Sequence, residues 1–442
     1  MNGKLLLNNF RIFTAESCED FFTGYVLVEG EVIREVGKGS YPIERIPPDC
    51  VYIDGDEKIL MPGLINCHTH MYSAFARGMG IKFFSPDNFR QLLEQLWWKL
   101  DKTLNEKTVF YSGLISAVEM VKNGVTTFID HHSSPSAVRG SLKYLAKAIY
   151  EICGLKGIYC YETSDRDGED VCKMAIEENM EFHELSKAYD DKIGSLFGLH
   201  ASFTLSEDTL QRVSEADFPI HVHVGEAPED GILHQKEFSM TPVERFEKYS
   251  ILKSNSLLSH CINITEKDLN IIKSNNCLIV LNPQSNMNNG VGIPDYYRMK
   301  DHGIKILLGN DAYGYDFSKE IRLLPLTQRY LYEDTRKFDM NELYEVVFRN
   351  SSEYVSNILG SYIGVIKPGY KADIITYDYN SPTPITPENF LSHFYFGIID
   401  NFKPAWVISN GRILKNENKI CLPEKEIFEE TRLLSEKIWR DM

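Results

Sequence analysis

Short apolar runs alternate with amphipathic stretches through the middle of the chain. Between about residues 56 and 312, each run leads through a polar junction into a segment with helical periodicity. Eight runs have this form, at 59–70, 125–132, 155–162, 193–202, 219–226, 256–262, 277–286 and 304–312. The helical segments between them include 106–123, 137–152, 168–188, 206–216 and 265–274. The pattern predicts strands that alternate with helices.

This alternation predicts a fold of the α/β class, a (β/α)8 TIM barrel over residues 56–362. Strands that alternate with helices pair in parallel through right-handed crossovers, and nearly continuous apolar strands are buried on both faces. Eight such strands close a barrel. The 442 residues leave room for a smaller unit beside it.

The two ends of the chain follow a different pattern. Residues 1–55 and 363–422 contain short strands and turns, and neither segment has enough strands to bury a sheet face by itself. We therefore expect the two segments to pair into one composite β-sandwich beside the barrel. Residues 423–442 have the periodicity of an amphipathic C-terminal helix.

Composition and charge exclude several classes of partner. The formal net charge of -16 disfavours binding to nucleic acid or to an anionic membrane, because both depend on clustered Lys and Arg. No apolar run reaches the roughly 18 residues of a membrane span, so we expect a cytoplasmic protein that acts on a small molecule. The nine cysteines lack CxxC spacing and are expected to be reduced.

Nearly every predicted strand ends in an ionisable or amide side chain. In chain order these are His68 and His70, His131 and His132, Glu162, His200, His223 and Glu226, His260, the Ser285-Asn286 pair, and Asp311. Barrel enzymes build their sites at the C-terminal ends of the strands. The pattern therefore predicts one polar site at a single mouth of the barrel.

Four of these side chains have the chemistry of a metal site. His68 and His70 lie two residues apart on an extended backbone, so both imidazoles point to one side and can bind one ion. Taken alone, the pair is equally consistent with two histidines of the barrel interior. His223 and Asp311 complete an N3O shell suited to one divalent ion per chain, Zn2+ or Fe2+. His221 should also face inward, in a packing or supporting role.

Two further residues are placed for proton transfer. Glu226 lies three residues beyond His223, where it can reach a metal-activated water as a general base. The alternative is a solvated loop carboxylate, which is how we interpret the nearby Glu229 and Asp230. His260 ends an apolar run and should project into the barrel mouth, unless it is a hydrogen-bonded core histidine.

These residues lie in motifs that resemble the amidohydrolase superfamily. The matching segments are 62–70 (PGLINCHTH), 221–226 (HVHVGE), 258–261 (LSHC) and 309–311 (GND). More narrowly, residues 96–101, 130–135, 285–289 and 379–384 are similar to the SsnA-type aminohydrolases. That group is a chlorohydrolase- and deaminase-like branch associated with selenium-linked purine catabolism.

The resemblance implies a split β-sandwich, a homodimer and hydrolytic deamination of a purine-like heterocycle. It assigns metal ligation to His68, His70, His223 and Asp311, and catalysis to Glu226, His260 and Asp311. Candidates for binding the substrate are Arg77, Trp98, His131, Glu162, His200 and Asn286. We expect His131 and Glu162 to border the substrate pocket and His132 to point elsewhere.

Two alternatives are weighed against deamination. Cyclic amide opening by two metal ions would use a carboxylated lysine at the end of the fourth strand, where this chain has His200. The nearest lysine, Lys192, precedes that strand. A non-catalytic barrel would have lost its metal ligands, whereas all the expected ligands are present here. The sequence therefore favours a mononuclear aminohydrolase.

Overall fold

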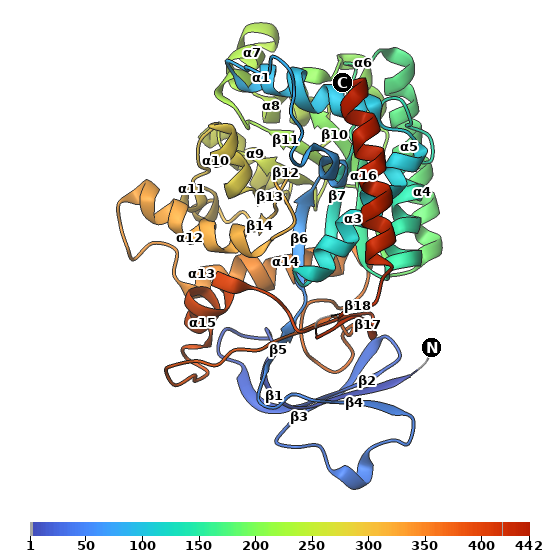
Figure 1. Ribbon diagram of the computed structural model, residues 1–442. Helices are drawn as coiled ribbons and strands as arrows, with labels where there is room; N and C mark the ends of the chain where they lie inside the picture. The colour runs from blue at the N-terminus through green and yellow to red at the C-terminus, as the bar shows by residue number, and fades with distance from the viewer. Residues whose placement is uncertain (1–2, 418) are drawn as a thin grey trace.

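The computed structural model describes residues 3–417 and 419–442. These form a barrel surrounded by helices, with a separate sheet packed below it (Figure 1). Met1, Asn2 and Asn418 belong to the predicted sandwich but lie outside the described residues. No helix in the described part of the chain is both long and apolar enough to cross a membrane.

The barrel wall consists of two parallel sheets that meet edge to edge. The first contains β6 (Leu64–Thr69), β7 (Val125–His132), β8 (Lys156–Tyr161) and β9 (Ile193–Ser195). The second contains β10 (Phe197–Ala201), β11 (Ile220–Val224), β12 (Leu257–His260), β13 (Leu278–Leu281) and β14 (Ile306–Leu308). Bridges from Thr163 to Leu199 and from Thr69 to Asp311 join the two sheets on either side. The barrel is thereby closed.

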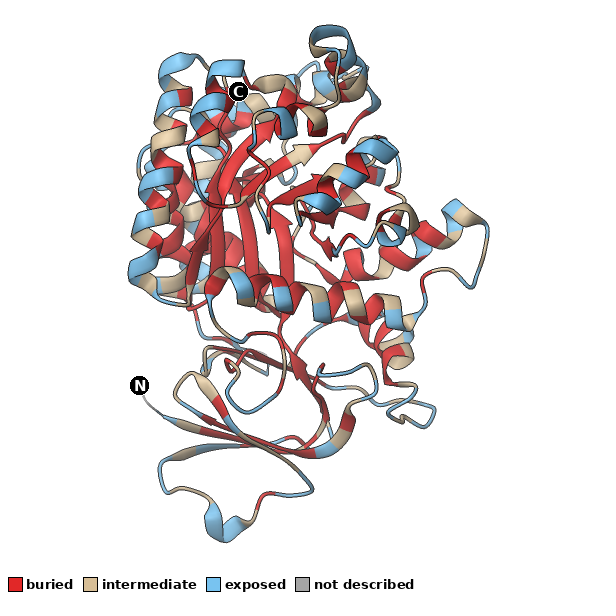
Figure 2. Ribbon diagram, turned by 180° about the vertical axis from the view of Figure 1, so that it is seen from behind, coloured by how far each residue is buried: buried red, intermediate tan, exposed pale blue. Residues whose placement is uncertain are grey.

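The strands are buried almost throughout, while the surrounding helices expose their outer faces (Figure 2). The longer barrel helices are α3 (Glu106–Lys122), α5 (Glu169–Ser186), α6 (Glu207–Ser214), α9 (Glu266–Ser274), α12 (Ser318–Tyr332) and α14 (Ser351–Leu359). The shorter ones are α1 (Phe89–Leu92), α2 (Trp98–Leu100), α4 (Ser141–Ala146), α7 (Pro228–Phe238), α8 (Pro242–Lys248), α10 (Pro283–Asn289), α11 (Tyr296–Asp301), α13 (Met340–Tyr344) and α15 (Phe390–His393). Caps fix several starts, as where Asn105 and Ser206 accept backbone N–H groups of α3 and α6.

The two chain ends form one mixed nine-stranded sheet. Its N-terminal strands are β1 (Lys4–Phe13), β2 (Phe21–Glu29), β3 (Val32–Lys38), β4 (Cys50–Asp54) and β5 (Ile59–Pro62). Its C-terminal strands are β15 (Ile374–Tyr377), β16 (Trp406–Ser409), β17 (Arg412–Asn416) and β18 (Lys419–Ile420). Buried residues from both ends, such as Leu7, Val28, Ile374 and Ile408, share one core.

Strand β5 is the point at which the two ends meet. It pairs in parallel with β1 and antiparallel with β15. Residues Ile59–Pro62, expected to begin the first barrel strand, therefore belong to the lower sheet, and the barrel strand begins at Leu64. The expected barrel boundary at residue 56 is corrected accordingly, because an apolar run can pass from one sheet into another without a change in its hydrophobic pattern.

The C-terminal helix α16 (Glu424–Asp441) lies along α3 on the side of the barrel (Figure 1). Lys122 Nζ lies 2.5 Å from Glu424 Oε1. At the other end of the helix, Trp439 Nε1 donates to the Phe75 carbonyl at 2.7 Å. The amphipathic periodicity predicted the helix, and these contacts fix where it packs.

A buried ion pair connects barrel strand β8 to the lower sheet. Lys156 Nζ lies 2.5 Å from Asp373 Oδ1 and donates to Asn410 Oδ1 at 2.8 Å, and both members of the pair are essentially fully buried. Removal of one partner leaves an uncompensated buried charge. We expect Asp373→Ala to lower the free energy of unfolding in urea by about 3–5 kcal/mol.

The matched control is Arg349→Ala, which breaks an exposed pair with Glu345. That substitution should change the free energy of unfolding by less than about 1 kcal/mol. Similar losses from the two variants would contradict a special role for the buried pair.

Candidate active site and metal centre

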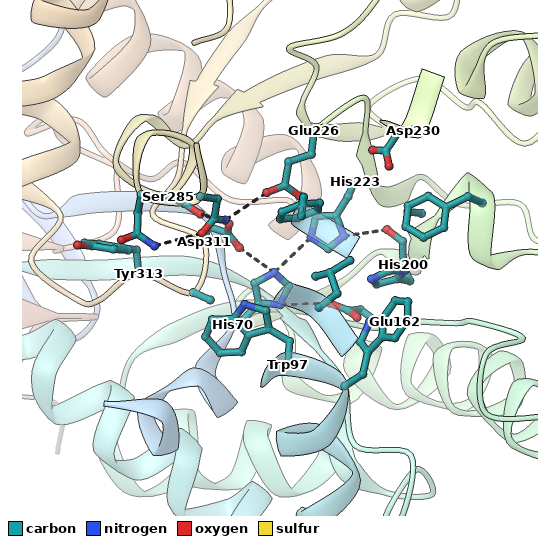
Figure 3. Close-up of a pocket in the computed structure, with 18 of the residues that line it drawn as sticks. His70, Trp97, Glu162, His200, His223, Glu226, Asp230, Ser285, Asp311 and Tyr313 are labelled. Carbon is teal, nitrogen blue, oxygen red and sulfur yellow. Dashed lines mark hydrogen bonds and ion pairs between the residues drawn. The ribbon is translucent and has the colours of Figure 1, made fainter. Parts of the chain in front are cut away.

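The four predicted metal ligands lie close together at one mouth of the barrel, and Figure 3 shows three of them, His70, His223 and Asp311. His68 and His223 belong to two groups of possible metal ligands, one with His70 and His131 and the other with His260 and Asp311. His70 Nε2 lies 3.0 Å from Asp311 Oδ1 and 3.2 Å from His223 Nε2. His68 Nε2 lies 3.5 Å from the same Asp311 oxygen. Asp311 is held beside β6 by the backbone, because its N–H donates to the His68 carbonyl at 3.0 Å. Closure of the barrel therefore assembles the cluster.

Backbone contacts fix the tautomers of two of these histidines. His70 Nδ1 lies 2.6 Å from the His131 carbonyl, and His223 Nδ1 lies 2.8 Å from the His200 carbonyl. A carbonyl oxygen only accepts hydrogen bonds, so each Nδ1 carries the proton and each Nε2 presents a lone pair. Metal-bound histidines are held in this way. Two lone pairs that face one another at 3.2 Å repel unless a proton or a metal ion lies beside both, and the donor set of these residues fits a divalent ion.

The electrostatics of the cluster agree with this fit. Burial lowers the pKa of His68 to about 4 and the pKa of His223 well below its ordinary value, which keeps both rings neutral. Burial also opposes ionisation of Asp311, but its contacts with His68 and His70 hold its pKa well below the usual range. Burial likewise lowers the pKa of His70, yet Asp311 and Glu162 raise it to about 9. The carboxylates of Asp311 and Glu162 therefore favour a positive charge beside His70.

His221 and His131 lie beneath the cluster. His68 Nδ1 is 3.0 Å from His221 Nε2, so His221 orients the ring of His68. The ring of His131 stacks on that of His221 at 4.5 Å between centroids and is completely buried. His221 thus has the supporting position expected of it.

Glu226 and His260 face one another beside the cluster. Glu226 Oε2 lies 3.5 Å from His260 Nε2, and Figure 3 shows the Glu226 side chain directed toward the cavity. Burial, followed by the charge of Asp311, raises the pKa of Glu226 well above its ordinary value. Burial lowers the pKa of His260 to about 3. The pair therefore combines a carboxyl group able to hold a proton with a neutral imidazole.

A cavity of about 710 Å³, its open mouth included, lies above these groups. The apolar wall contains Tyr72, Phe89, Leu93, Trp97, Trp98 and Phe203. The side chains of Glu226, His223 and Asp311 are also part of its lining. The cavity can therefore hold a flat heterocycle against the candidate reacting groups.

Three of the six predicted substrate-binding residues line this cavity: Trp98, Glu162 and His200. Burial raises the pKa of Glu162 to about 7, although the charge of His70 opposes the shift. Burial lowers the pKa of His200 well below its ordinary value.

The other three candidates are not among the residues that line this cavity, and their contact with substrate stays a prediction. Arg77 follows the short 3-10 helix Met71–Ala76, and its exposed side chain pairs with Glu119 on α3 at 3.4 Å. His131 is completely buried, and the centroid of its ring lies 4.7 Å from that of His223 and 5.5 Å from that of His70. Asn286 belongs to α10, not to a strand end, and its amide donates to His260 Nδ1 at 2.7 Å.

His132 also points away from the cavity. Its Nε2 lies 2.9 Å from Ser134 Oγ, and its ring packs against Tyr161. This is the orientation predicted from the alternation of side chains along the strand.

Sequence reasoning missed several cavity residues, notably Arg166, Asp230 and Tyr313. Asp230 was expected to be solvated but is buried, and burial raises its pKa to about 7. Pro228 was the available signal, because proline favours the first turn of a helix and here begins α7. Arg166 follows a strand end by several residues, and only tertiary contacts bring its guanidinium over the ring of Trp98 at 5.2 Å.

A comparison with protein families identifies the class of protein that has this fold and site. The chain belongs to the amidohydrolase family, whose model matches residues 59–414. The predicted superfamily resemblance and fold class are thereby confirmed, and the chain is a hydrolase of carbon–nitrogen bonds.

Individual relatives are similar along almost the whole chain. A 5-methylthioadenosine/S-adenosylhomocysteine deaminase of Halothermothrix orenii is 29% identical, over 96% of this chain and 97% of the relative. A 5'-deoxyadenosine deaminase of Methanococcus aeolicus is 26% identical, over 91% and 93%. The solved structure of an adenosine deaminase from Xanthomonas campestris with bound zinc has a TM-score of 0.84 at 18% identity and covers 98% of both chains.

Proposed function

We propose that this protein is an aminohydrolase that removes the exocyclic amino group of an adenine nucleoside or a related purine. One divalent ion per chain would be held by His68, His70, His223 and Asp311, which contact one another at 3.0 to 3.5 Å. The observation that carries the proposal is the pair of Nε2 lone pairs of His70 and His223, which face one another at 3.2 Å on the wall of the cavity. The named activities of the relatives support the choice of substrate.

Zinc is the ion that the solved adenosine deaminase contains, and the histidine-rich donor set suits Zn2+ or Fe2+. An ion held by these residues supplies Lewis-acid activation of water. Glu226 takes a proton from the attacking water and delivers it to the ring nitrogen beside the target carbon. His260 donates through Nε2 to the oxygen as negative charge develops. A second proton passes from the added hydroxyl through Asp311 to the amino group, which leaves as ammonia.

The apolar wall accounts for binding of the heterocycle. Trp98 lines the cavity with an aromatic ring 5.9 Å from that of His200, and His200 and Glu162 supply hydrogen-bonding atoms to the lining. Trp98, His200 and Glu162 are therefore proposed to contact the substrate. The homodimer, the cytoplasmic location, the two-part domain division and the link to selenium-associated purine catabolism stay predictions from the sequence.

Cyclic amide opening by two metal ions has less support. Lys192 pairs with Glu31 of β2–β3 and with Asp191, at 3.1 and 3.0 Å, next to the lower sheet. It therefore lies at the opposite mouth from His200. Metal analysis separates the two reactions, because the proposal requires one ion per chain and the alternative requires two.

We expect protein loaded with zinc to release ammonia from at least one adenine nucleoside. The panel would contain adenosine, 5'-methylthioadenosine, 5'-deoxyadenosine and S-adenosylhomocysteine, with guanine, a pterin, cytosine and hydantoin as other classes. Turnover should fall within about 1 to 1,000 per second for a true substrate. Ring opening of hydantoin without ammonia release from any nucleoside would contradict the proposal.

A further inference from the structure

Helix α10 (Pro283–Asn289) supplies three side chains that each contact a different reacting group. Ser285 Oγ donates to Asp311 Oδ2 at 2.5 Å, Asn286 Nδ2 donates to His260 Nδ1 at 2.7 Å, and Asn289 Nδ2 lies 3.5 Å from Glu226 Oε1. One short helix therefore touches the carboxylate of the metal cluster, the imidazole and the proposed general base.

The helical spacing explains how one element reaches three groups. Ser285 and Asn289 are four residues apart and so lie on one face, where Asn289 Nδ2 is 3.4 Å from Ser285 Oγ. Asn286, the next residue along the helix, is completely buried and faces His260. Figure 3 shows Ser285, Asp311 and Glu226 close together on one side of the cavity.

Both ends of the helix are fixed. Pro283 occupies its first position, and the buried carboxyl group of Glu320 on α12 accepts the Gln284 N–H at 3.0 Å. Gly290 ends the helix with φ of 66°, a left-handed conformation that favours glycine. A helix held at both ends presents its side chains in one arrangement, as positioning of reacting groups requires.

Each contact constrains a different atom. The Ser285 hydroxyl occupies Asp311 Oδ2, which leaves Oδ1 directed at His68 and His70. The Asn286 amide occupies Nδ1 of His260, so the imidazole proton lies on Nε2, the nitrogen 3.5 Å from Glu226. Asn289 fixes the rotation of the Glu226 carboxyl group.

We propose that α10 positions the reacting groups through three separate links, with Ser285 acting on metal affinity, Asn286 on the donor proton of His260, and Asn289 on the orientation of Glu226. This inference rests on the proposed function. The three residues act through other side chains and are positioning residues.

The first test measures zinc affinity by competition with a chromophoric chelator and needs no substrate. Ser285→Ala should weaken zinc binding about 10- to 100-fold, the usual effect of losing a hydrogen bond to a metal ligand. Ser285→Thr keeps the hydroxyl and should restore binding to within about threefold, since it preserves that bond. Asn286→Asp and the exposed control Met287→Ala should bind zinc as the wild type does. Wild-type affinity in Ser285→Ala, or equal weakening in all the α10 variants, would overturn the assignment.

The second test uses adenosine deamination. Asn286→Asp has the same shape but no donor, so the His260 proton moves to Nδ1; we expect kcat to fall about 100-fold, as when one transition-state donor is lost. KM should stay within about threefold, because the lost interaction belongs to the transition state. Asn289→Ala should lower kcat about 3- to 10-fold, the effect of one modest hydrogen bond, and Met287→Ala should not change it.

A loss in Asn286→Asp that falls on KM alone would show that Asn286 serves binding and would overturn its positioning role. Absence of nucleoside turnover in the wild type would instead contradict the proposed function. Zinc affinity is measured without a substrate, so it tests the role of Ser285 whichever result the deamination assay gives.

Discussion

Glu226→Gln is expected to retain its metal ion and to lose about 1,000- to 10,000-fold in kcat, towards the upper limit for general acid–base catalysis. Glutamine preserves the size and packing of the side chain but cannot accept the water proton. The structure supports this separation of roles, because Glu226 is buried beside His260 while the facing Nε2 atoms belong to His70 and His223. Zinc content and turnover of the best nucleoside substrate would be measured together.

Glu229→Gln is the matched control, since Glu229 lies in the first turn of α7 and is absent from the lining of the cavity. It should keep wild-type turnover. A Glu226→Gln protein that retains more than about a tenth of the activity would contradict the assigned role, given the expected size of the effect. Loss of zinc from that variant would make Glu226 a ligand.

His223→Ala is expected to lose both the ion and the activity. The remaining His68, His70 and Asp311 would lack one of the four donors proposed to hold the ion, which weakens its binding. Without the ion, the pKa of the attacking water returns from about 7 towards about 15.7, so we expect turnover to fall at least about 10,000-fold. Zinc content after dialysis, followed by the deamination assay, tests both parts.

His302→Ala serves as the control, because His302 is a half-buried histidine that contacts the Arg298 carbonyl on α11, away from the cavity. It should keep its zinc and its activity. Full zinc occupancy in His223→Ala would remove His223 from the ligand set, and circular dichroism of both variants would separate this outcome from unfolding.

Much of the fold follows from local sequence. The period of the apolar runs specifies strand or helix, and the predicted segments 106–123, 168–188 and 206–216 correspond to α3, α5 and α6. Parallel pairing places all strand ends at one mouth, which is why His68, His223 and Glu226 could be selected without a structure. A polar residue directly after a buried strand is a local signal.

The sequence did not predict the local structure and the side-chain contacts that lie between the strand ends or deeper in the barrel. The apolar run that ends at Asn286 continues past β13 into α10, because Pro283 begins a helix there. His260 and Asp311 have φ values of 72° and 56°, a left-handed conformation unusual outside glycine that directs both side chains toward the cluster. Neither the helix that begins at Pro283 nor the left-handed conformations of His260 and Asp311 can be recognised from the spacing of apolar residues.

The sequence by itself therefore determined the barrel, the class of chemistry and the residues expected at its mouth, because these depend on side-chain period and strand direction. Tertiary structure alone decided that His131 lies beneath the cluster, that Arg77 turns outward and that Ser285 and Asn289 reach Asp311 and Glu226. These outcomes depend on the register between strands that meet only when the barrel closes, and on contacts between residues far apart in the chain.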